Sequence, residues 1–260
     1  MASTRNNVEL SIIVPTLNEE AYISQLLCSL HSQSTNSFEV IVVDGGSQDD
    51  TLKVAASLGA RVFVLQGSKE FEARNYAVAH SRAPLLMFSC ADVIFPPTAL
   101  NSILRHFQHD ADLAALTGPD VPYDGGPALR VIYSIYNTLR FLFSKFPPPL
   151  RAFSSSTNFL VVRRRSFEES GGFKVNDVNA DGIMGRYLVD RHRTLFDNEV
   201  IAYISARRAS NWGMARFTRH YLYVLENFFP PISGRRWFRN LKSKSGKSHG
   251  EIHNETPHSA

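Results

Sequence analysis

Residues 10–47 read LSIIVPTLNEEAYISQLLCSLHSQSTNSFEVIVVDGGS, and two strands with a helix between them can be recognised in this stretch. The run 10–17 is rich in β-branched residues and is interrupted by Pro15, which is typical of a short buried strand. From Asn18, a suitable N-cap, apolar residues recur at 22, 23, 26, 27 and 30, which is helical spacing. The run 38–47 predicts a second buried strand that ends on Asp44 and two glycines.

The same alternation continues through the next 45 residues. The sequence predicts a helix over 49–59, a strand over 60–67, a helix over 68–81 and a strand over 83–92. Strands that alternate with helices in this way form a parallel sheet with helices on both faces. We therefore predict an α/β fold.

Polar residues follow three of the predicted strands, at Pro15–Glu19, Asp44–Ser47 and Cys90–Asp92. In open α/β sheets, ligands bind at the carboxyl ends of the strands, where these residues would converge. Asp, Asn and Ser are also ordinary loop residues, so any one position alone has little weight. Carboxylates at three strand ends together favour a binding crevice.

Two common nucleotide-binding motifs are absent from the sequence. There is no G-x-G-x-x-G after the first strand and no G-x-x-x-x-G-K-[ST] anywhere in the chain. The glycines of VDGGSQDD are adjacent and do not match either pattern. A dinucleotide-dependent dehydrogenase and a P-loop ATPase are therefore disfavoured.

The charge is distributed unevenly along the 260 residues. Residues 1–125 contain 7 Lys and Arg against 14 Asp and Glu, whereas residues 126–260 contain 21 against 10. A basic half suggests a phosphate-bearing partner such as a nucleic acid, an anionic lipid or a phosphorylated substrate. With two cysteines, no apolar run of membrane-spanning length and a polar N-terminus, we expect a cytoplasmic protein in a reducing compartment.

The pattern changes after residue 118. Residues 128–146 predict an amphipathic helix whose apolar stripe includes residues 131, 135, 139, 142 and 146, and residues 215–229 predict a second, aromatic-rich one. Such helices with Arg and Lys beside them can lie in a membrane interface, or they can simply pack on the sheet. Residues 242–260 are polar and without periodicity, which predicts a disordered tail.

Five segments together resemble an ordered series of motifs from one known family. These are SIIVPTLNEE, VIVVDGGSQDDT, ARNYAV, FSCADVIFPP and SFEESGGF, which look like the motifs of family-2 glycosyltransferases from about residue 10 to residue 210. The resemblance implies the GT-A fold, a mainly parallel twisted sheet flanked by helices. It divides the chain into a nucleotide-sugar-binding half (1–118), an acceptor-binding half (119–210), a basic amphipathic region (211–241) and the tail (242–260).

The resemblance also assigns residues to the donor site. Asp44 matches the strand-end Asp that contacts the base or ribose, and Arg74 falls in the ARN motif near the donor phosphates, where a guanidinium suits phosphate oxygens. The predicted nucleotide-sugar-binding residues are Pro15, Thr16, Glu19, Asp44, Ser47, Arg74, Ala91, Asp92, Arg207 and Arg208.

Asp92 matches the last residue of the family's D-x-D motif, which implies a divalent cation, Mg²⁺ or Mn²⁺, as cofactor. Oxygen ligands suit such cations, which neutralise the charge on a leaving nucleoside diphosphate. The first Asp of the motif is Cys90 in this chain. A thiol is a poor ligand for a hard cation, so Asp92 is the one metal ligand that we predict.

The family's Glu-Asp motif, aligned on ADGIMGRYL, places Asp181 on the catalytic base and Ala180 where Glu is usual. Such a carboxylate would deprotonate the acceptor hydroxyl, with inversion at the sugar. Asp177 is the fallback, and Asp181 could instead be a helix N-cap. Arg207 or Arg208 resembles a late arginine that holds the pyrophosphate, and either could equally be surface charge.

The leading hypothesis is an inverting glycosyltransferase that moves a hexose, mannose or glucose, from GDP-mannose or a UDP-sugar to a lipid-linked or polyprenyl-phosphate acceptor. It would act peripherally at the cytosolic membrane face. One alternative is a soluble glycosyltransferase that modifies a protein or a free glycan. Another is a non-catalytic nucleotide-sugar-binding protein, because Cys90 and Ala180 each replace an acidic residue. Binding to nucleic acid is not expected, because the arginines are dispersed among apolar stripes.

Overall fold

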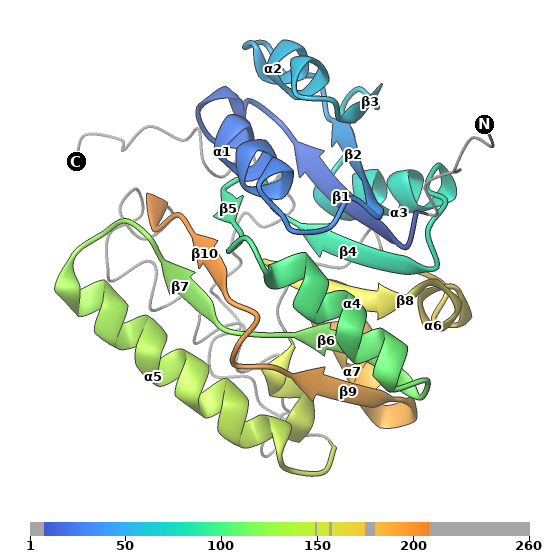
Figure 1. Cartoon of the computed structure of the whole chain (residues 1–260), viewed down its shortest axis with the longest axis vertical. Helices are drawn as coiled ribbons and strands as arrows, with labels where there is room; N and C mark the ends of the chain where they lie inside the picture. The colour runs from blue at the N-terminus through green and yellow to red at the C-terminus, as the bar shows by residue number, and fades with distance from the viewer. Residues whose placement is uncertain (1–7, 149, 156–157, 175–179, 208–260) are drawn as a thin grey trace, which may run out of the picture.

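The computed structural model describes residues 8–148, 150–155, 158–174 and 180–207, which form two sheets with helices packed around them (Figure 1). The strands are β1 (Leu10–Thr16), β2 (Phe38–Asp44), β3 (Arg61–Val64), β4 (Leu85–Ser89), β5 (Val93–Ile94), β6 (Leu113–Thr117), β7 (Asp120–Pro122), β8 (Phe159–Arg163), β9 (Arg193–Phe196) and β10 (Ala202–Ile204). The helices are α1 (Glu20–His31), α2 (Thr51–Ser57), α3 (Glu70–Ala79), α4 (Ala99–His109), α5 (Pro127–Ser144), α6 (Arg164–Glu169), α7 (Ala180–Arg191) and the short 3-10 helix η1 (Leu150–Ser154).

The larger sheet has seven strands in the order β3-β2-β1-β4-β8-β6-β9. The pairs β1–β2, β2–β3, β1–β4 and β6–β9 are parallel, while β8 runs antiparallel to both of its neighbours. The four strands predicted from residues 10–92 are confirmed as β1 to β4, and so is the mainly parallel α/β architecture. Strands from both sides of residue 118 belong to this one sheet.

Alternate residues of β1 point to opposite faces of the sheet and enter two separate cores. Ile12 and Val14 belong to the core under α1 and α4, whereas Ile13 belongs to the core on the side of α3, α6 and α7. Figure 1 shows α1 and α4 on the near side of the sheet. All seven residues of β1 are buried, which explains why most of this strand is apolar on both faces.

The predicted N-cap of the first helix is wrong by one residue. Helix α1 begins at Glu20 with Glu19 at the cap position, and Asn18 instead has a positive φ of 55°. Asn tolerates this left-handed conformation better than most residues, because its short polar side chain bonds locally. Asn18 therefore turns the chain between β1 and α1 instead of capping the helix.

The second half of the described chain adds a small sheet and a long helix. The small sheet has the order β5-β10-β7, and α5 packs beside β7 along one edge of the molecule (Figure 1). The helix predicted over 128–146 is confirmed as α5, which begins at Pro127, a residue that suits a first helical turn. The predicted helix 215–229, the region 211–241 and the tail 242–260 lie outside the described residues.

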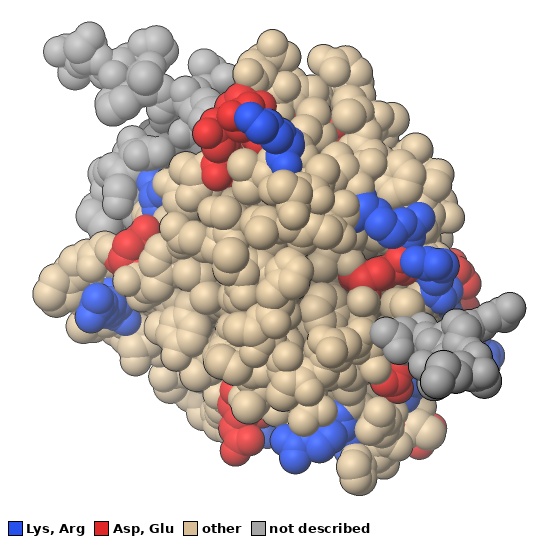
Figure 2. Space-filling model, turned by 45° about the horizontal axis from the view of Figure 1, so that its top comes forward, with Lys and Arg blue, Asp and Glu red and all other residues tan. Residues whose placement is uncertain are grey.

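Charged side chains are spread out on the face shown in Figure 2. Basic and acidic residues lie mainly around its rim, close to one another, and uncharged residues form its middle. Nucleic-acid-binding proteins usually present a continuous basic patch, and the described part of this face does not. Among the described residues, no helix combines the length and the hydropathy needed to cross a bilayer.

Candidate functional site

The residues predicted to line the crevice lie around the point where β1 and β4 separate. These two strands are paired only from Leu10 to Ile13, so β1 continues for three residues with β2 as its one neighbour. Pro15 lies in this unpaired part, where its missing N–H does not cost a bond to β4. The divergence leaves the carboxyl ends of β1, β2 and β4 around a common space, as expected for a ligand site in an α/β sheet.

Asp44 at the end of β2 organises the loop beside this space and is fully buried. Its carboxylate accepts hydrogen bonds from the hydroxyls of Thr16 at 2.9 Å and Ser47 at 2.5 Å. The same carboxylate accepts bonds from the backbone N–H groups of Gly46 at 2.8 Å and Ser47 at 2.7 Å. The predicted residues Thr16, Asp44 and Ser47 are thus brought together, and a nucleotide that contacts Asp44 must replace one of these donors.

The turn at Asn18 ties two loops of the crevice together. The backbone N–H of Asn18 donates to the Ser47 hydroxyl at 2.8 Å, and its side-chain oxygen accepts from the backbone N–H of Gln48 at 2.8 Å. The next residue, Glu19, donates its backbone N–H to the Thr51 hydroxyl at 2.8 Å. These bonds fix Glu19 with its carboxylate inside the protein, where it is 2% exposed.

Arg207 joins the two remaining predicted acids of the crevice. Its Nε donates to Asp92 Oδ2 at 2.9 Å, and its Nη2 lies 2.9 and 2.8 Å from the two carboxylate oxygens of Glu19. Burial alone would lower the pKa of the Arg207 guanidinium, but the charges of Asp92 and Glu19 outweigh burial and raise that pKa. Arg207 is therefore a permanent cation held between two carboxylates at the strand ends.

Four residues beside this cluster were missed by the sequence reasoning. The Tyr22 ring lies under the Arg207 guanidinium at 4.1 Å, and the Asp124 carboxylate accepts a bond from the Ser205 hydroxyl at 2.8 Å. Burial raises the pKa of the Tyr123 phenol, and the charges of Asp124 and Asp92 raise it further. For Tyr123 and Asp124, the adjacent glycines of YDGG could have indicated a tight loop in the sequence.

Cys90 and Arg74 are buried next to each other. Cys90 is 3% exposed, and its Sγ lies 3.8 Å from Nη2 of Arg74. Arg74 is completely buried, pairs with Glu70 at 2.8 Å and lies within 6 Å of three phenylalanine rings, including Phe88 at 5.9 Å. Its contact with a donor phosphate stays a prediction. Ala91, next to Asp92, is also buried.

The predicted base lies at the start of α7. Asp181 is in the first turn of this helix, and its Oδ1 accepts a hydrogen bond from the N–H of Gly182 at 2.8 Å. Ala180 is buried in the core on the side of the sheet that α3, α6 and α7 cover. The role of Asp181 as a base stays a prediction, and the fallback Asp177 and the second arginine, Arg208, lie outside the described residues.

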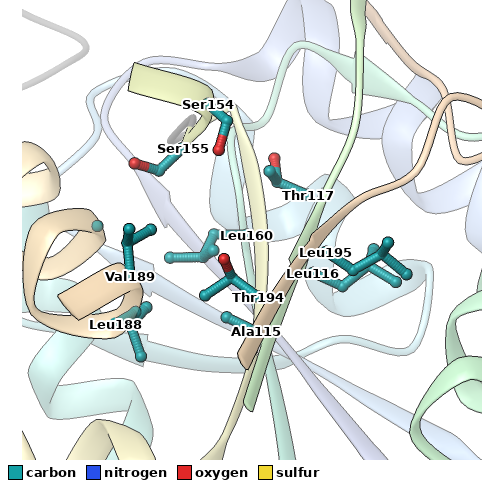
Figure 3. A pocket seen from close by; sticks show the side chains of 11 residues that line it. Ala115, Leu116, Thr117, Ser154, Ser155, Leu160, Leu188, Val189, Thr194 and Leu195 are labelled. Carbon is teal, nitrogen blue, oxygen red and sulfur yellow. The ribbon is translucent and has the colours of Figure 1, made fainter. Parts of the chain in front are cut away.

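A small pocket occurs elsewhere, between β6, β8, β9, α7 and η1 (Figure 3). Leu188, Val189 and Leu195 make it largely apolar, and the hydroxyls of Ser154 and Thr117 lie near one end of it. None of the predicted donor-site residues lines this pocket. It is a gap in the core and not part of the strand-end crevice.

The residues of the crevice can be tested for their fit to a divalent cation. Asp92 and Glu19 offer carboxylate oxygens, which suit Mg²⁺ or Mn²⁺, whereas the Cys90 thiol faces Arg74 and does not. Among the described residues, Asp92 and Glu19 bring two carboxylates to the one guanidinium of Arg207. No group of three potential metal-ligating side chains occurs among the described residues, so a cation held by Asp92 would take most of its ligands from water or from the donor.

A family model described as glycosyl transferase family 2 matches residues 11–171. Among curated proteins, the chain is similar to the O-antigen chain rhamnosyltransferase RfbN of Salmonella typhimurium, with 27% identity over 183 residues. The alignment covers 67% of this chain and 58% of that protein. The chain spans less than two thirds of the length of the curated relatives that it matches first.

Solved structures show the same architecture. The mannosyltransferase PcManGT from Pyrobaculum calidifontis, in complex with GDP-Man and Mn2+, has a TM-score of 0.62 at 18% identity, covering 88% of this chain and 67% of that one. The structure of S. aureus TarS 1–349 in complex with UDP-GlcNAc has a TM-score of 0.62 at 20% identity, covering 85% and 71%. At this identity the likeness establishes the fold. Together with the family match, it shows that this chain has the GT-A fold and belongs to glycosyl transferase family 2.

Proposed function

We propose that this protein is an inverting glycosyltransferase. It takes a hexose, mannose or glucose, from a nucleotide-diphosphate sugar and transfers it to a lipid-linked or polyprenyl-phosphate acceptor at the cytosolic membrane face. The observation that supports this proposal most directly is the cluster of Asp92, Glu19 and Arg207 beside Asp44. It places acids and a permanent cation at the carboxyl ends of the parallel strands, where a family-2 chain would hold its donor.

The two parts of a nucleotide-sugar need different groups, and the crevice contains both kinds. The loop of Pro15, Thr16, Asp44 and Ser47 offers a buried carboxylate and hydroxyls for the base and ribose. Arg207 offers a planar guanidinium for the diphosphate, because its two donor nitrogens can match two phosphate oxygens. A diphosphate that binds there must compete with Asp92 and Glu19 for this guanidinium.

A divalent cation bound at Asp92 would supply positive charge to the leaving diphosphate. The protein's own groups would do the rest: Arg207 holds the diphosphate and Asp181 accepts the proton of the acceptor hydroxyl. The hydroxyl oxygen then forms a bond to the anomeric carbon from the side opposite the diphosphate, and the bond from that carbon to the phosphate oxygen breaks. Inversion follows from this single displacement.

The proposed acceptor rests on the comparison with RfbN, whose name assigns it to O-antigen chains. The donor proposal rests on solved relatives of the same fold, which hold GDP-Man in one case and UDP-GlcNAc in another. These ligands belong to those proteins. We propose GDP-mannose first and a UDP-hexose second for this chain.

Donor binding is tested by calorimetric titration of the full chain with GDP, UDP and their sugars, with and without Mn²⁺. We expect one nucleotide to bind more tightly than the other, and binding to strengthen when Mn²⁺ is present. If the folded protein binds none of these nucleotides under either condition, the proposed function is wrong.

Transfer is tested with Asp181→Asn, which keeps the shape of the side chain and removes the base. Loss of a general base lowers turnover by about 10² to 10⁴-fold, while donor affinity should stay unchanged. The control is Asp190→Asn, an exposed acid on the same helix, which should keep full turnover. Wild-type turnover in Asp181→Asn would show that another group accepts the proton.

A non-catalytic nucleotide-sugar-binding protein is the second candidate. It is favoured by one observation, the burial of Cys90 against Arg74 at the position where the family has an acid. This candidate predicts tight nucleotide binding and no sugar transfer or donor hydrolysis in the wild-type chain. Turnover that depends on Asp181 would exclude it.

A further inference from the structure

Helix α5 is held to the protein by polar side chains on its inner face. Arg140 is completely buried, and its guanidinium pairs with Asp120 at 3.1 Å and donates to the carbonyl oxygen of Ser154 at 3.2 and 3.0 Å. One turn earlier, the Asn137 amide bonds to both the backbone N–H and the carbonyl of Asp120, at 3.1 and 2.7 Å. Leu129 and Tyr133 of the same helix are buried in the core, so hydrogen bonds and charge add to apolar packing on this face.

The outer face of α5 is apolar and exposed. The described residues include eight exposed large apolar side chains, and six of these belong to α5 or follow it within two residues. They are Val131, Ile132, Ile135, Leu139, Leu142 and Phe146, with exposed fractions from 38% to 58%. We call them the α5 stripe. From Val131 to Leu142 the stripe extends about 16 Å along the helix axis.

The bonds of the inner face prevent α5 from burying this stripe by rotation. Such a rotation would bring Arg140 to the surface and leave the Asp120 carboxylate, which is 1% exposed, without its guanidinium. An unpaired buried charge is strongly unfavourable. The alternative in which this stripe packs on the sheet is therefore not met, because its six side chains are exposed among the described residues.

The basic residues near the stripe indicate that its partner is negatively charged. Residues 126–167 contain seven Lys and Arg and no Asp or Glu. Two of the cations, Arg130 and Lys145, are exposed at opposite ends of the stripe, next to Val131 and Phe146. An apolar stripe between exposed cations matches a surface that is apolar inside and negatively charged outside, which is the surface of an anionic bilayer.

Other occupants match this charge less well. The remaining chain, residues 208–260, has nine Lys and Arg against three Asp and Glu, so it would add positive charge to a positive face. A second copy of the chain would likewise place Arg130 and Lys145 near their own counterparts. Both arrangements bring like charges together.

From these observations we infer that the α5 stripe lies in the headgroup region of an anionic membrane and orients the donor crevice toward it. The loop before α5 supports the orientation, because the Asp124 carboxylate accepts bonds from Ser205 and the backbone N–H of Ala206, directly before Arg207. The start of α5 therefore lies beside the donor crevice. The inference adds a membrane-docking surface to the proposed function. Only the identity of the lipid-linked acceptor rests on that proposed function.

The test is flotation of the full chain with vesicles of phosphatidylcholine alone or mixed with phosphatidylglycerol. We expect binding to the mixed vesicles that weakens as NaCl is raised, because screening reduces the attraction of Arg130 and Lys145. Val131→Asp should weaken binding by about tenfold, since it replaces a buried apolar contact with a charge of the wrong sign. The matched control is Val64→Asp on β3, because Val64 is 55% and Val131 is 58% exposed.

Several outcomes would overturn the inference. Equal vesicle binding by Val131→Asp and Val64→Asp would show that α5 does not make the contact. Absence of vesicle binding, with a melting temperature lowered only in Val131→Asp, would show that residues 208–260 cover the stripe. Concentration-dependent self-association that Val131→Asp abolishes would show a second copy there. Because no nucleotide is added, these results are independent of the donor-binding titration that tests the proposed function.

Discussion

Two buried arginines, Arg140 on α5 and Arg207 at the strand ends, differ in the number of carboxylates that they hold. Arg140 pairs with one carboxylate, Asp120, and donates its other N–H groups to Ser154 and neighbouring oxygens. Arg207 pairs with two carboxylates, Asp92 and Glu19. Among the described residues, the first guanidinium thus faces one carboxylate and the second faces two.

This difference separates a structural ion pair from a binding site. The buried Arg140–Asp120 pair joins α5 to β7, and its guanidinium also donates to the Ser154 carbonyl, so it fixes one helix to one strand. Two carboxylates share the Arg207 guanidinium in a buried place, and carboxylate oxygens are the ligands that a hard cation prefers. Under the proposed function, Arg207 would exchange a carboxylate for phosphate oxygens when the donor binds.

The largest expected effect on folding comes from Arg140→Met. Removing one partner of a buried ion pair leaves the Asp120 charge uncompensated, which costs about 3–5 kcal/mol of unfolding free energy. Denaturant unfolding should show this loss, and Asp120→Asn in the same chain should recover much of it by removing the stranded charge. Unchanged stability in the single variant would mean that α5 is held by its apolar contacts alone.

Arg207→Met tests the other half of the comparison. Without the guanidinium, Asp92 and Glu19 repel each other, so we expect nucleotide affinity to fall by about tenfold or more. The melting temperature of this variant should rise with Mn²⁺ more than that of the wild type, because the cation replaces the missing positive charge. Arg140→Met is the control and should show no such additional response. An equal response of Arg207→Met and the wild type would contradict a cation site at Asp92.

The sequence predicted the first four strands correctly because each is a short apolar run bounded by turn residues, and helices alternate with them. It could not predict that β8 is antiparallel, since an apolar run has no direction until its partners are known. The small sheet was also missed, because β5 and β10 have only two and three residues. Short strands leave no periodic signal.

The candidate site was predicted in part. The strand-end residues Thr16, Asp44 and Asp92 follow from the βα order, because parallel strands share one carboxyl edge. The bonds of Arg207 to Asp92 and Glu19 cross 115 and 188 residues, and no local pattern can indicate contacts at that separation. The stripe of α5 was also found by its spacing. Its direction was not, because periodicity defines a face and the polar anchor on Asp120 decides where that face points.

Cys90→Asp is expected to have a smaller effect than Arg207→Met. The Cys90 thiol is buried beside the Arg74 guanidinium, so a carboxylate at this position would pair with Arg74 before it could reach a cation at Asp92. We expect the affinity for Mn²⁺ in the presence of nucleotide to change by less than about threefold, which is under 1 kcal/mol. Titration of both proteins with Mn²⁺ measures this. Tenfold tighter binding would show that position 90 faces the cation.

The smallest expected effect concerns Glu39. Here one carboxylate lies near two arginines, whereas Arg207 is one arginine near two carboxylates. One buried carboxylate here lies near two partly exposed arginines, Arg61 at 2.6 Å and Arg82 at 3.3 Å. Burial by itself raises the pKa of Glu39, but bonds from the Arg82 N–H, the Ser11 hydroxyl and Arg61 outweigh it and lower that pKa. The ionised form therefore stabilises the fold at pH values above the unfolded-state pKa, about 4.3, and this contribution is lost as the pH falls through the lowered folded-state pKa.

Glu39→Gln should accordingly be less stable than the wild type at neutral pH, and the difference should shrink as the solution is acidified below about pH 4. We expect a loss of about 1 kcal/mol at most, because solvent and salt screen both arginines. Denaturant unfolding of the two proteins between pH 3 and pH 7 measures it. A difference that persists unchanged at the acid end would mean that shape, and not charge, makes Glu39 useful. In that case the ion pairs of Arg61 and Arg82 with Glu39 would not contribute to stability.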